Sequence, residues 1–205
     1  NIAMVNELKL VLSRMGVNIW EVIDAAKTKP FGFMPFYPGP GMGGHCIPID
    51  PFYLSWKAKE YNTEAKFIEL AGEINRKMTE NIAHRIGKAL NDDKKSIRGS
   101  KILIVGVAYK KDIDDVRESP ALRIMDLLKY KGGKINYHDP YVRNMDSLKS
   151  LDLTKDTIEE QDAIVITTDH TSIDYALLGK YAKVIVDTRN IMATVKNPKA
   201  RVIRA

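Results

Sequence analysis

The sequence predicts an α/β chain in which a helical region precedes a doubly wound parallel sheet. Up to about residue 90, apolar residues recur every three or four positions, which is the period of an amphipathic helix. After residue 100, short apolar runs alternate with helical segments, a pattern typical of parallel strands that are buried on both faces. The polar segment 91–100 separates the two patterns, so we predict a helical domain over 1–92 and a sheet domain over 93–205.

Four helices are expected in the helical domain, over residues 2–15, 19–27, 52–60 and 63–90. Asn18 and Thr63 stand where the N-caps of the second and fourth helices belong. At 1.5 Å per residue, the fourth helix spans about 40 Å, which is more than a small domain needs. We therefore predict a homodimer through this long central helix, although packing within the chain explains its apolar stripe equally well.

Four strands are expected in the sheet domain, over residues 101–106, 135–138, 163–167 and 184–187. Two helices are expected between them, over residues 120–130 and 172–179. Ser119 is placed to cap the first of these helices, and Pro120 suits its first turn.

The composition excludes several classes of protein. Hydrophobic residues make up 44% of the 205 residues, as in a soluble globular protein, and no apolar run approaches membrane-spanning length. The single cysteine excludes an internal disulfide and fits the reducing cytoplasm. The four histidines lack metal-ligand spacing, so no metal site is expected. The net charge of +6 suits an anionic ligand, but it is spread thinly along the chain.

Residues 38–51 contain four glycines, four prolines and the only cysteine of the chain, Cys46. Such a density of backbone breakers predicts a stiff loop whose backbone approaches a ligand closely. A lone cysteine in this loop is a candidate nucleophile, and Asp50 close by strengthens that interpretation. The alternatives are a plain turn with a small buried thiol. Phe36 and Tyr37 precede the glycines and either stack on a ligand or attach the loop to the core.

The turn after strand 101–106 lacks the G-x-G-x-x-G fingerprint of a dinucleotide site, because Gly106 is followed by Val-Ala-Tyr-Lys-Lys-Asp. We therefore do not expect this Rossmann-like domain to bind NAD in the usual way. The turn instead carries Lys110 and Lys111 at the carboxyl end of the strand, where open α/β sheets bind their ligands. Arg189 follows the strand 184–187 at the same edge. These cations suit a phosphate, and solvated surface lysines are the alternative.

Four separated motifs occur along the chain. They are Gly-Gly-His-Cys-Ile-Pro within residues 38–51, Gly-Val-Ala-Tyr-Lys-Lys-Asp at 106–112, Arg-Glu-Ser-Pro at 117–120 and His-Asp-Pro at 138–140. Together and in this order, they resemble the UDP-glucose/GDP-mannose dehydrogenase family. The Gly-Gly-His-Cys motif is similar to the branch that acts on UDP-N-acetylhexosamines such as UDP-N-acetylmannosamine. The resemblance covers the whole chain and implies a central helical domain followed by a UDP-sugar-binding domain.

The resemblance implies an NAD-dependent oxidation of the sugar C6 alcohol to a carboxylate, in the synthesis of surface polysaccharide precursors. It implies that Cys46 is the nucleophile, which forms a thiohemiacetal and then a thioester, and that Asp50 orients water and assists proton transfer. The family's amino-terminal NAD-binding domain has no counterpart here, and the chain opens on a helical pattern without an initiator methionine. We therefore expect part of a longer polypeptide, with NAD bound mainly by the missing domain and no activity in this chain alone.

By the same resemblance, the nucleotide sugar is held by the glycine-rich loop and by the edge of the sheet. The implied substrate-binding residues are Phe36, Tyr37, Gly41, Gly43, Gly44, Tyr109, Lys110 and Arg189. The implied partners are a UDP-sugar and a second copy of the chain in the cytoplasm, with no nucleic acid and no membrane.

Two other classes of function are weighed against this enzyme. A non-catalytic module that binds nucleotide sugars or dimerises would use the same fold without chemistry, but the presence of Cys46 and Asp50 favours the enzyme. A basic nucleic-acid-binding protein is disfavoured, because the aromatic residues cluster in the glycine-rich loop and not among the basic residues.

Overall fold

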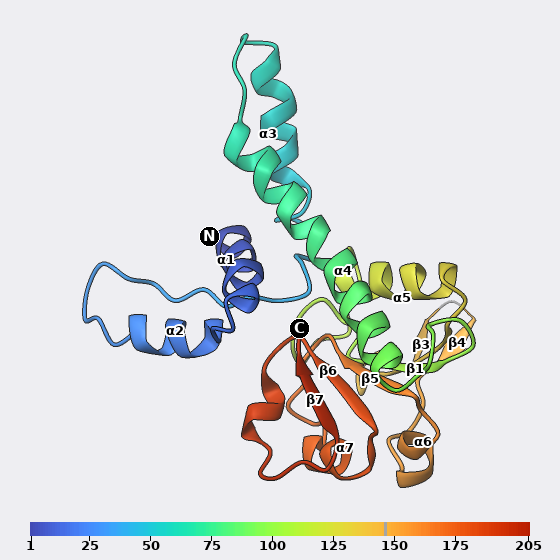
Figure 1. Ribbon diagram of the computed structural model, residues 1–205. Coiled ribbons are helices and arrows are strands. Elements are labelled where there is room, and N and C mark those ends of the chain that lie inside the picture. Colours follow the sequence, from blue (N-terminus) through green and yellow to red (C-terminus); the bar gives the residue numbers. More distant parts are fainter. Residues whose placement is uncertain (146) are drawn as a thin grey trace.

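The computed structural model describes residues 1–145 and 147–205 and confirms an α/β fold with the helices first and the sheet second (Figure 1). The amino-terminal helices are α1 (Ile2–Arg14), α2 (Ile19–Ala26), α3 (Asp50–Lys59) and α4 (Lys66–Asp92). Asn18 caps α2 as predicted, because its side chain accepts a hydrogen bond from the backbone N–H of Trp20 at 3.2 Å.

The predicted cap of α4 is wrong. The helix begins at Lys66, and Ala65 before it has no side chain that can cap. Thr63 belongs instead to the turn that ends α3, where its backbone N–H donates to the carbonyl of Ala58 at 3.2 Å. Thr63 is a residue type that often caps helices and it precedes an amphipathic segment, but here it lies in the turn after α3 and not at the start of α4.

Five parallel strands form one sheet in the order β2 (Lys134–His138), β1 (Lys101–Val105), β5 (Ala163–Ile166), β6 (Val184–Asp187) and β7 (Arg201–Arg204). The order reverses at β1, which pairs with both β2 and β5. The second half of α4 and α5 (Pro120–Tyr130) cover one face of the sheet. The other face is covered by α6 (Lys155–Glu159), α7 (Tyr175–Tyr181) and the 3-10 helix η1 (Ile191–Thr194). Strands covered on both faces are buried along their length, which explains their continuous apolar runs.

Five short elements among the described residues were not predicted from the sequence, one of them the 3-10 helix η1. β7 has the sequence Arg-Val-Ile-Arg, so its two apolar residues are too few to form the continuous apolar run that marks β1, β5 and β6. β3 (Asn144–Met145) and β4 (Leu148–Lys149) form a small antiparallel pair, and α6 has five residues. Elements of this length are too short to show a period.

Helix α4 has 27 residues and two different surroundings along its length. In its second half, Met78, Ile82, Ile86 and Leu90 are fully buried, and all but Met78 belong to the core between the sheet and α5. In its first half, Phe67 is 89% exposed, and this half projects with α3 away from the sheet (Figure 1). Packing within the chain therefore explains only the second half of the apolar stripe. The predicted boundary at residues 92 and 93 stays a prediction.

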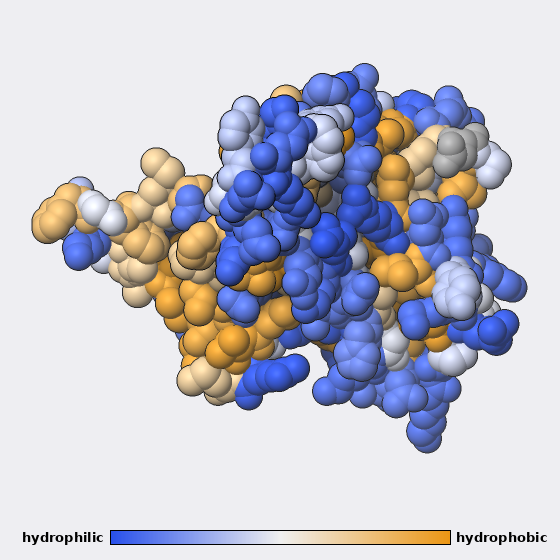
Figure 2. Space-filling view, turned by 90° about the horizontal axis from the view of Figure 1, so that it is seen from above, coloured by the Kyte–Doolittle hydropathy of each residue, from blue (hydrophilic) through white to orange (hydrophobic). Residues whose placement is uncertain are grey.

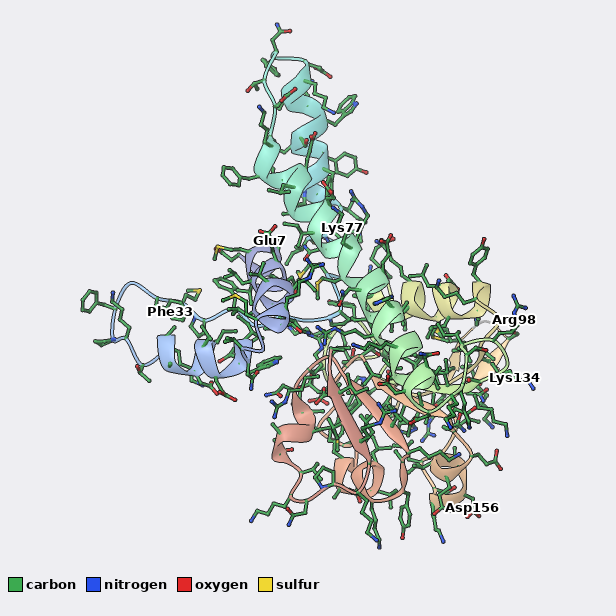
Figure 3. The ribbon with its side chains drawn as sticks, in the orientation of Figure 1. Glu7, Phe33, Lys77, Arg98, Lys134 and Asp156 are labelled. Carbon is green, nitrogen blue, oxygen red and sulfur yellow. The ribbon has the colours of Figure 1, made fainter. Side chains whose placement is uncertain are left out.

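Two surfaces of the molecule expose large apolar side chains. The hairpin surface, on α3, α4 and the turn between them, consists of Tyr53, Leu54, Trp56, Tyr61, Phe67 and Leu70. The α1–α2 surface, on these helices and the loop after them, consists of Met4, Leu8, Val11, Met15, Val17, Val22, Phe31, Phe33 and Met34. Figure 2 shows apolar residues gathered on the side of the molecule where α1 and α2 lie in Figure 1. Phe33 stands on the loop far from the sheet (Figure 3).

Within residues 1–145 and 147–205, no helix is both long enough and apolar enough to cross a membrane.

Candidate functional site

Residues 38–44, here called the glycine loop, pack directly against Tyr109. A side chain at Gly43 would place its Cβ 2.7 Å from Tyr109 Cβ, and one at Gly44 would place its Cβ 2.9 Å from the Tyr109 ring. The backbone N–H of Gly44 donates to the carbonyl of Arg117 at 2.9 Å. Gly44 also has a φ of +96°, a conformation that glycine adopts most easily. These glycines are therefore required for close backbone approach to another part of the chain, and the predicted approach to a ligand stays a prediction.

Asn6 of α1 holds the other end of the glycine loop. Its side-chain oxygen accepts a hydrogen bond from the backbone N–H of Gly39 at 2.9 Å, and its amide donates to Asn75 of α4 at 3.0 Å. Gly39 in turn lies against Arg189, because a Cβ there would fall 2.7 Å from the guanidinium. Sequence analysis missed Asn6, which is fully buried. The sequence does contain a sign of this role, because Asn6 is a polar residue within the apolar face of α1, and buried polar groups need a hydrogen-bond partner.

Cys46 and Asp50 lie one helical turn apart where the loop enters α3. The carbonyl of Cys46 accepts hydrogen bonds from the backbone N–H groups of Ile49 at 3.1 Å and Asp50 at 2.8 Å. The thiol is exposed, and its Sγ lies 3.7 Å from Nδ1 of His45. Asp50 is exposed as well and is the first residue of α3. The thiol is therefore not a small buried hydrophobe, which was the alternative interpretation.

A cavity of about 370 Å³ separates the Cys46 segment from α4. Its lining is mainly apolar and includes Gly41 and Phe52 from the loop side, together with Gly72 from α4. Arg76 and Arg123 supply its cations. Of the predicted site residues, Gly41 reaches this cavity.

Phe36 and Tyr37 contact the helices and not the sheet edge. Phe36 is half-buried against the apolar cluster of α1 and α2. The ring of Tyr37 stacks on Trp20 of α2, with 5.6 Å between the ring centroids. The structure therefore gives both residues a packing role, and their predicted contact with a substrate stays a prediction.

Lys110 and Arg189 lie on loops at the carboxyl edge of the sheet, as the topology predicted. Residues 106–112, here called the β1 loop, carry Lys110, which is exposed and forms none of the ion pairs among the described residues. Arg189 donates from Nε to the carbonyl of Thr167 at 2.9 Å. Asp169 lies between the two loops, with a carboxylate oxygen 3.7 Å from Lys111 Nζ and another 3.9 Å from Arg189 Nε. Asp169 therefore partly neutralises Lys111 and Arg189 at this edge and leaves Lys110 without an ion pair among the described residues.

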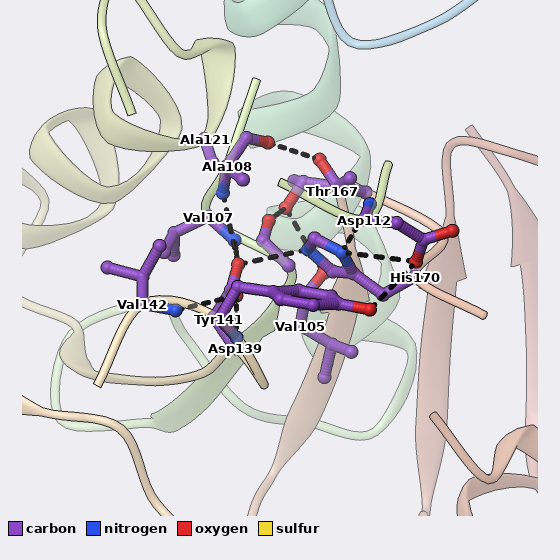
Figure 4. Close-up of polar contacts among 12 residues, drawn as sticks. Val105, Val107, Ala108, Asp112, Ala121, Asp139, Tyr141, Val142, Thr167 and His170 are labelled. Carbon is purple, nitrogen blue, oxygen red and sulfur yellow. Dashed lines mark hydrogen bonds and ion pairs between the residues drawn. The ribbon is translucent and has the colours of Figure 1, made fainter. Parts of the chain in front are cut away.

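A buried carboxylate, Asp139, supports the β1 loop from below (Figure 4). It follows β2 and accepts hydrogen bonds from His170 and from the backbone N–H groups of Val107, Ala108, Tyr141 and Val142. Burial would raise the pKa of Asp139, but the hydrogen bonds from His170 and the backbone outweigh it and lower the pKa to about 2. Asp139 was noticed only as part of a motif, and its role as an acceptor for the β1 loop was missed.

The turn after β1 does not fit a dinucleotide. In nucleotide-binding α/β domains, backbone N–H groups of this turn and the following helix face a phosphate. Here the N–H groups of Val107 and Ala108 are taken up by Asp139. The amino end of α5 is capped by Ser119, whose hydroxyl accepts from the N–H of Ala121 at 3.3 Å, and the glycine loop covers it.

The part of the chain that the structure describes groups no three His, Cys, Asp or Glu side chains so that they could hold a metal ion.

Two matches to one family cover most of the chain. Residues 1–77 match the central domain of the UDP-glucose/GDP-mannose dehydrogenase family, and residues 103–194 match its UDP binding domain. The chain belongs to this family. Cys46 and Asp50 fall in the segment that matches the central domain of the family. Tyr109, Lys110 and Arg189 fall in the segment that matches its UDP binding domain.

Relatives in the family carry the names of dehydrogenases of N-acetylated nucleotide sugars. The UDP-N-acetyl-D-mannosamine dehydrogenase of Pyrococcus horikoshii is 38% identical over 200 residues, which are 94% of this chain and 45% of that protein. The NDP-N-acetyl-D-galactosaminuronic acid dehydrogenase of Ralstonia solanacearum is 31% identical over 93% of this chain and 44% of that protein. The solved structure of UDP-D-ManNAc dehydrogenase from P. horikoshii has a TM-score of 0.83 at 35% identity, covering 98% of this chain and 48% of that one. The chain thus spans a little under half the length of these relatives.

Proposed function

We propose that this chain is the UDP-sugar-binding and thiol-bearing part of an NAD-dependent dehydrogenase. The reaction oxidises the C6 alcohol of a UDP-N-acetylhexosamine to the carboxylate. One observation carries the proposal: the glycine loop that leads to the exposed Cys46 packs against Tyr109, on the loop that also carries Lys110. A reactive thiol and a cation suited to a diphosphate therefore belong to adjoining segments of one surface.

Cys46 acts as a covalent catalyst in this proposal. Its thiol adds to the C6 aldehyde, so that a C–S bond forms and the proton passes to the former carbonyl oxygen. The aldehyde itself forms when the C6 alcohol loses a first hydride and its hydroxyl proton. Loss of a second hydride from C6, together with the proton of the thiohemiacetal hydroxyl, gives a thioester, and water then cleaves the C–S bond to release the uronate and the thiol. Asp50, one turn along, orients that water and takes up its proton.

NAD supplies the removal of hydride, and the turn after β1 does not fit it. We propose that residues outside this sequence bind NAD, which agrees with the chain spanning less than half of its relatives. The chain alone is then inactive. The names of the relatives support N-acetylhexosamine as the sugar.

The assembly is proposed to be a homodimer through the long helix α4. The support is the hairpin surface, where Phe67 of α4 is 89% exposed and Trp56 of α3 is 64% exposed. An exposed reduced thiol at Cys46 fits the cytoplasm.

The test uses the full-length protein with a UDP-N-acetylhexosamine and NAD. We expect Cys46→Ala to lower uronate formation on the order of 10³-fold or more, because the 205-residue sequence contains no other thiol that could form the thioester. The affinity for UDP, measured by calorimetry, is expected to stay within about twofold, since the thiol reacts at the sugar and not at the diphosphate. The matched control is Ile47→Ala, which truncates the neighbouring exposed side chain and should keep uronate formation.

Substantial uronate production by Cys46→Ala would rule out the thioester role. A wild-type protein that binds the UDP-sugar but forms no uronate would instead indicate a non-catalytic nucleotide-sugar-binding module.

A further inference from the structure

The ends of three neighbouring strands meet at a fully buried pair, Asp139 and His170, beneath the β1 loop (Figure 4). Asp139 follows β2, the β1 loop follows β1, and His170 lies on the loop after β5. Asp139 Oδ2 accepts from the N–H of Val107 at 2.7 Å and of Ala108 at 3.1 Å, which fixes the first half of the β1 loop. His170 Nε2 lies 3.0 Å from the same oxygen.

The hydrogen bonds of His170 define the position of its proton. Its Nδ1 accepts from the backbone N–H of Asp112 at 3.0 Å, so Nδ1 carries no proton. The proton is therefore on Nε2, where it is donated to Asp139. His170 thus connects the carboxylate that holds the start of the β1 loop to the residue that ends it.

Asp112 closes the β1 loop in a left-handed conformation, with a φ of +60°. This conformation is uncommon for a residue with a side chain, and it needs support from its surroundings. Besides the bond to His170, the Asp112 carboxylate accepts from the N–H of Thr171 at 2.8 Å and from its hydroxyl at 2.6 Å. The loop after β5 therefore fixes both the backbone and the side chain of Asp112.

Between these two anchors, Tyr109, Lys110 and Lys111 form the part of the β1 loop that is not fully buried, and Lys111 lies 3.7 Å from the carboxylate of Asp169. Tyr109 is half-buried and Lys110 is exposed, whereas Val107 and Ala108 are fully buried. The carbonyl of Ala108 is held by the hydroxyl of Thr168 at 2.6 Å. The flanks of the loop are therefore fixed by Asp139, His170 and Thr168, and none of these bonds uses the side chain of Tyr109 or Lys110.

We propose that His170, with its proton on Nε2, and Asp139 are positioning residues that hold the β1 loop so that Tyr109 and Lys110 meet a nucleoside diphosphate. The proposal rests on the proposed function, because it takes UDP as the ligand of this loop. Neither residue touches the ligand. Their contribution is to preorganise the loop, so that binding does not have to order it.

The test measures the affinity for UDP in the full-length protein by calorimetry. His170→Leu removes both hydrogen bonds of the ring, and we expect it to weaken UDP binding about tenfold. The amide of a glutamine side chain has N–H groups to donate to Asp139 and a carbonyl oxygen to accept from Asp112, so we expect His170→Gln to remain within about twofold of the wild type. The matched control is His138→Leu. His138 is half-buried nearby and bonds the carbonyl of Leu151 at 2.7 Å, so its loss should leave UDP binding unchanged.

A double-mutant cycle with Lys110→Ala separates positioning from general destabilisation. If His170 acts through the β1 loop, His170→Leu weakens binding less once the Lys110 side chain is gone. In the wild type, ¹⁵N NMR of the imidazole is expected to show a proton on Nε2 and none on Nδ1. That measurement needs no variant to fold.

The outcomes are distinguishable. A wild type that does not bind UDP would overturn the proposed function, and the positioning role with it. Measurable binding that is equal in the wild type and His170→Leu would overturn the positioning role alone, as would a proton found on Nδ1. Equal losses in His170→Leu and His170→Gln would also overturn it.

Discussion

Lys9 of α1 is a buried lysine without a carboxylate partner among the described residues. It is 5% exposed, and its Nζ donates to the backbone oxygen of Ala205. The pKa of Lys9 falls from its ordinary value of 10.5 to about 7, mainly because of burial, with Arg85 and Arg189 also lowering it and Asp187 opposing them. Lys9 is therefore a site where folding disfavours the charged form.

This pKa predicts how stability depends on pH. Between pH 7 and 10.5, the unfolded chain holds a proton on Lys9 that the folded chain has lost, so the free energy of unfolding rises with pH across this window. The contribution approaches about 1.4 kcal/mol per pH unit. We expect Lys9→Met to remove it and to be more stable than the wild type at pH 7, as measured by urea denaturation at several pH values.

The comparison that isolates Lys9 is Lys88→Met, which replaces an exposed lysine of α4. It should keep the pH dependence of the wild type. If the free energy of unfolding depended on pH in the same way in the wild type and in Lys9→Met, folding would not disfavour the charge of Lys9.

At the scale of residues, the sequence allowed the reactive groups to be predicted better than their supports. Cys46 and Lys110 were chosen by residue type and position, and both are exposed. Asn6 and His170 were missed, because each acts by accepting one backbone N–H from a distant segment. A sequence shows that a polar residue is present, but the fold decides which backbone group lies within its reach.

At the scale of elements, α4 contains two glycines in different surroundings. Alanine is favoured over glycine within a helix by about 0.8–1 kcal/mol. At Gly87, the nearest atom to a new Cβ is the flexible end of Ile97 at 3.1 Å, whereas at Gly72 the Phe52 ring lies at 2.3 Å. We expect Gly87→Ala to raise the free energy of unfolding by about 0.5–1 kcal/mol in urea denaturation.

We expect Gly72→Ala to raise the free energy of unfolding less than Gly87→Ala does, or to lower it. The reason is that the Phe52 ring must move away from α4, towards the cavity that it borders. In a Phe52→Leu background, the changes in the free energy of unfolding caused by Gly72→Ala and Gly87→Ala should be more nearly equal. Equal gains at both positions in the wild-type background would contradict the contact between Gly72 and Phe52.

Elements were predictable where one local rule acted alone. Ser119 caps α5 and Asn18 caps α2 as predicted, since a cap bonds to N–H groups within its own first turn. The cap assigned to Thr63 failed because the end of α3 uses that residue first. β7 escaped prediction because pairing with β6, and not its own pattern, makes it a strand.

At the scale of the whole molecule, the hairpin surface predicts self-association. We expect sedimentation equilibrium of the full-length protein to show a dimer. Phe67→Lys should raise its dissociation constant at least about tenfold, because a charge would be buried in the contact. Tyr130→Lys is the matched control, since Tyr130 of α5 is also 89% exposed but lies outside the hairpin surface.

A monomeric wild type, or a dimer that Phe67→Lys leaves intact, would contradict a contact through this part of α4.

The overall topology could be predicted from the alternation of strands and helices, whereas the difference in burial between the two halves of α4 could not. The stripe from Phe67 to Ala89 has one period throughout, so the sequence gives no sign that its first half is exposed and its second half buried. That difference depends on where the sheet ends in space.

The shared helix limits how the two halves of this chain can be exchanged or inherited. A cut in the polar segment 91–100, where composition changes, would remove Ile82, Ile86 and Leu90 from the sheet and leave its covering layer incomplete. The match to the central domain ends at residue 77, and the buried stretch of α4 begins at Met78. The end of that match and the start of the buried stretch therefore fall together in the middle of a continuous helix. Recombination between relatives would preserve folding only if the second half of α4 travelled with the sheet.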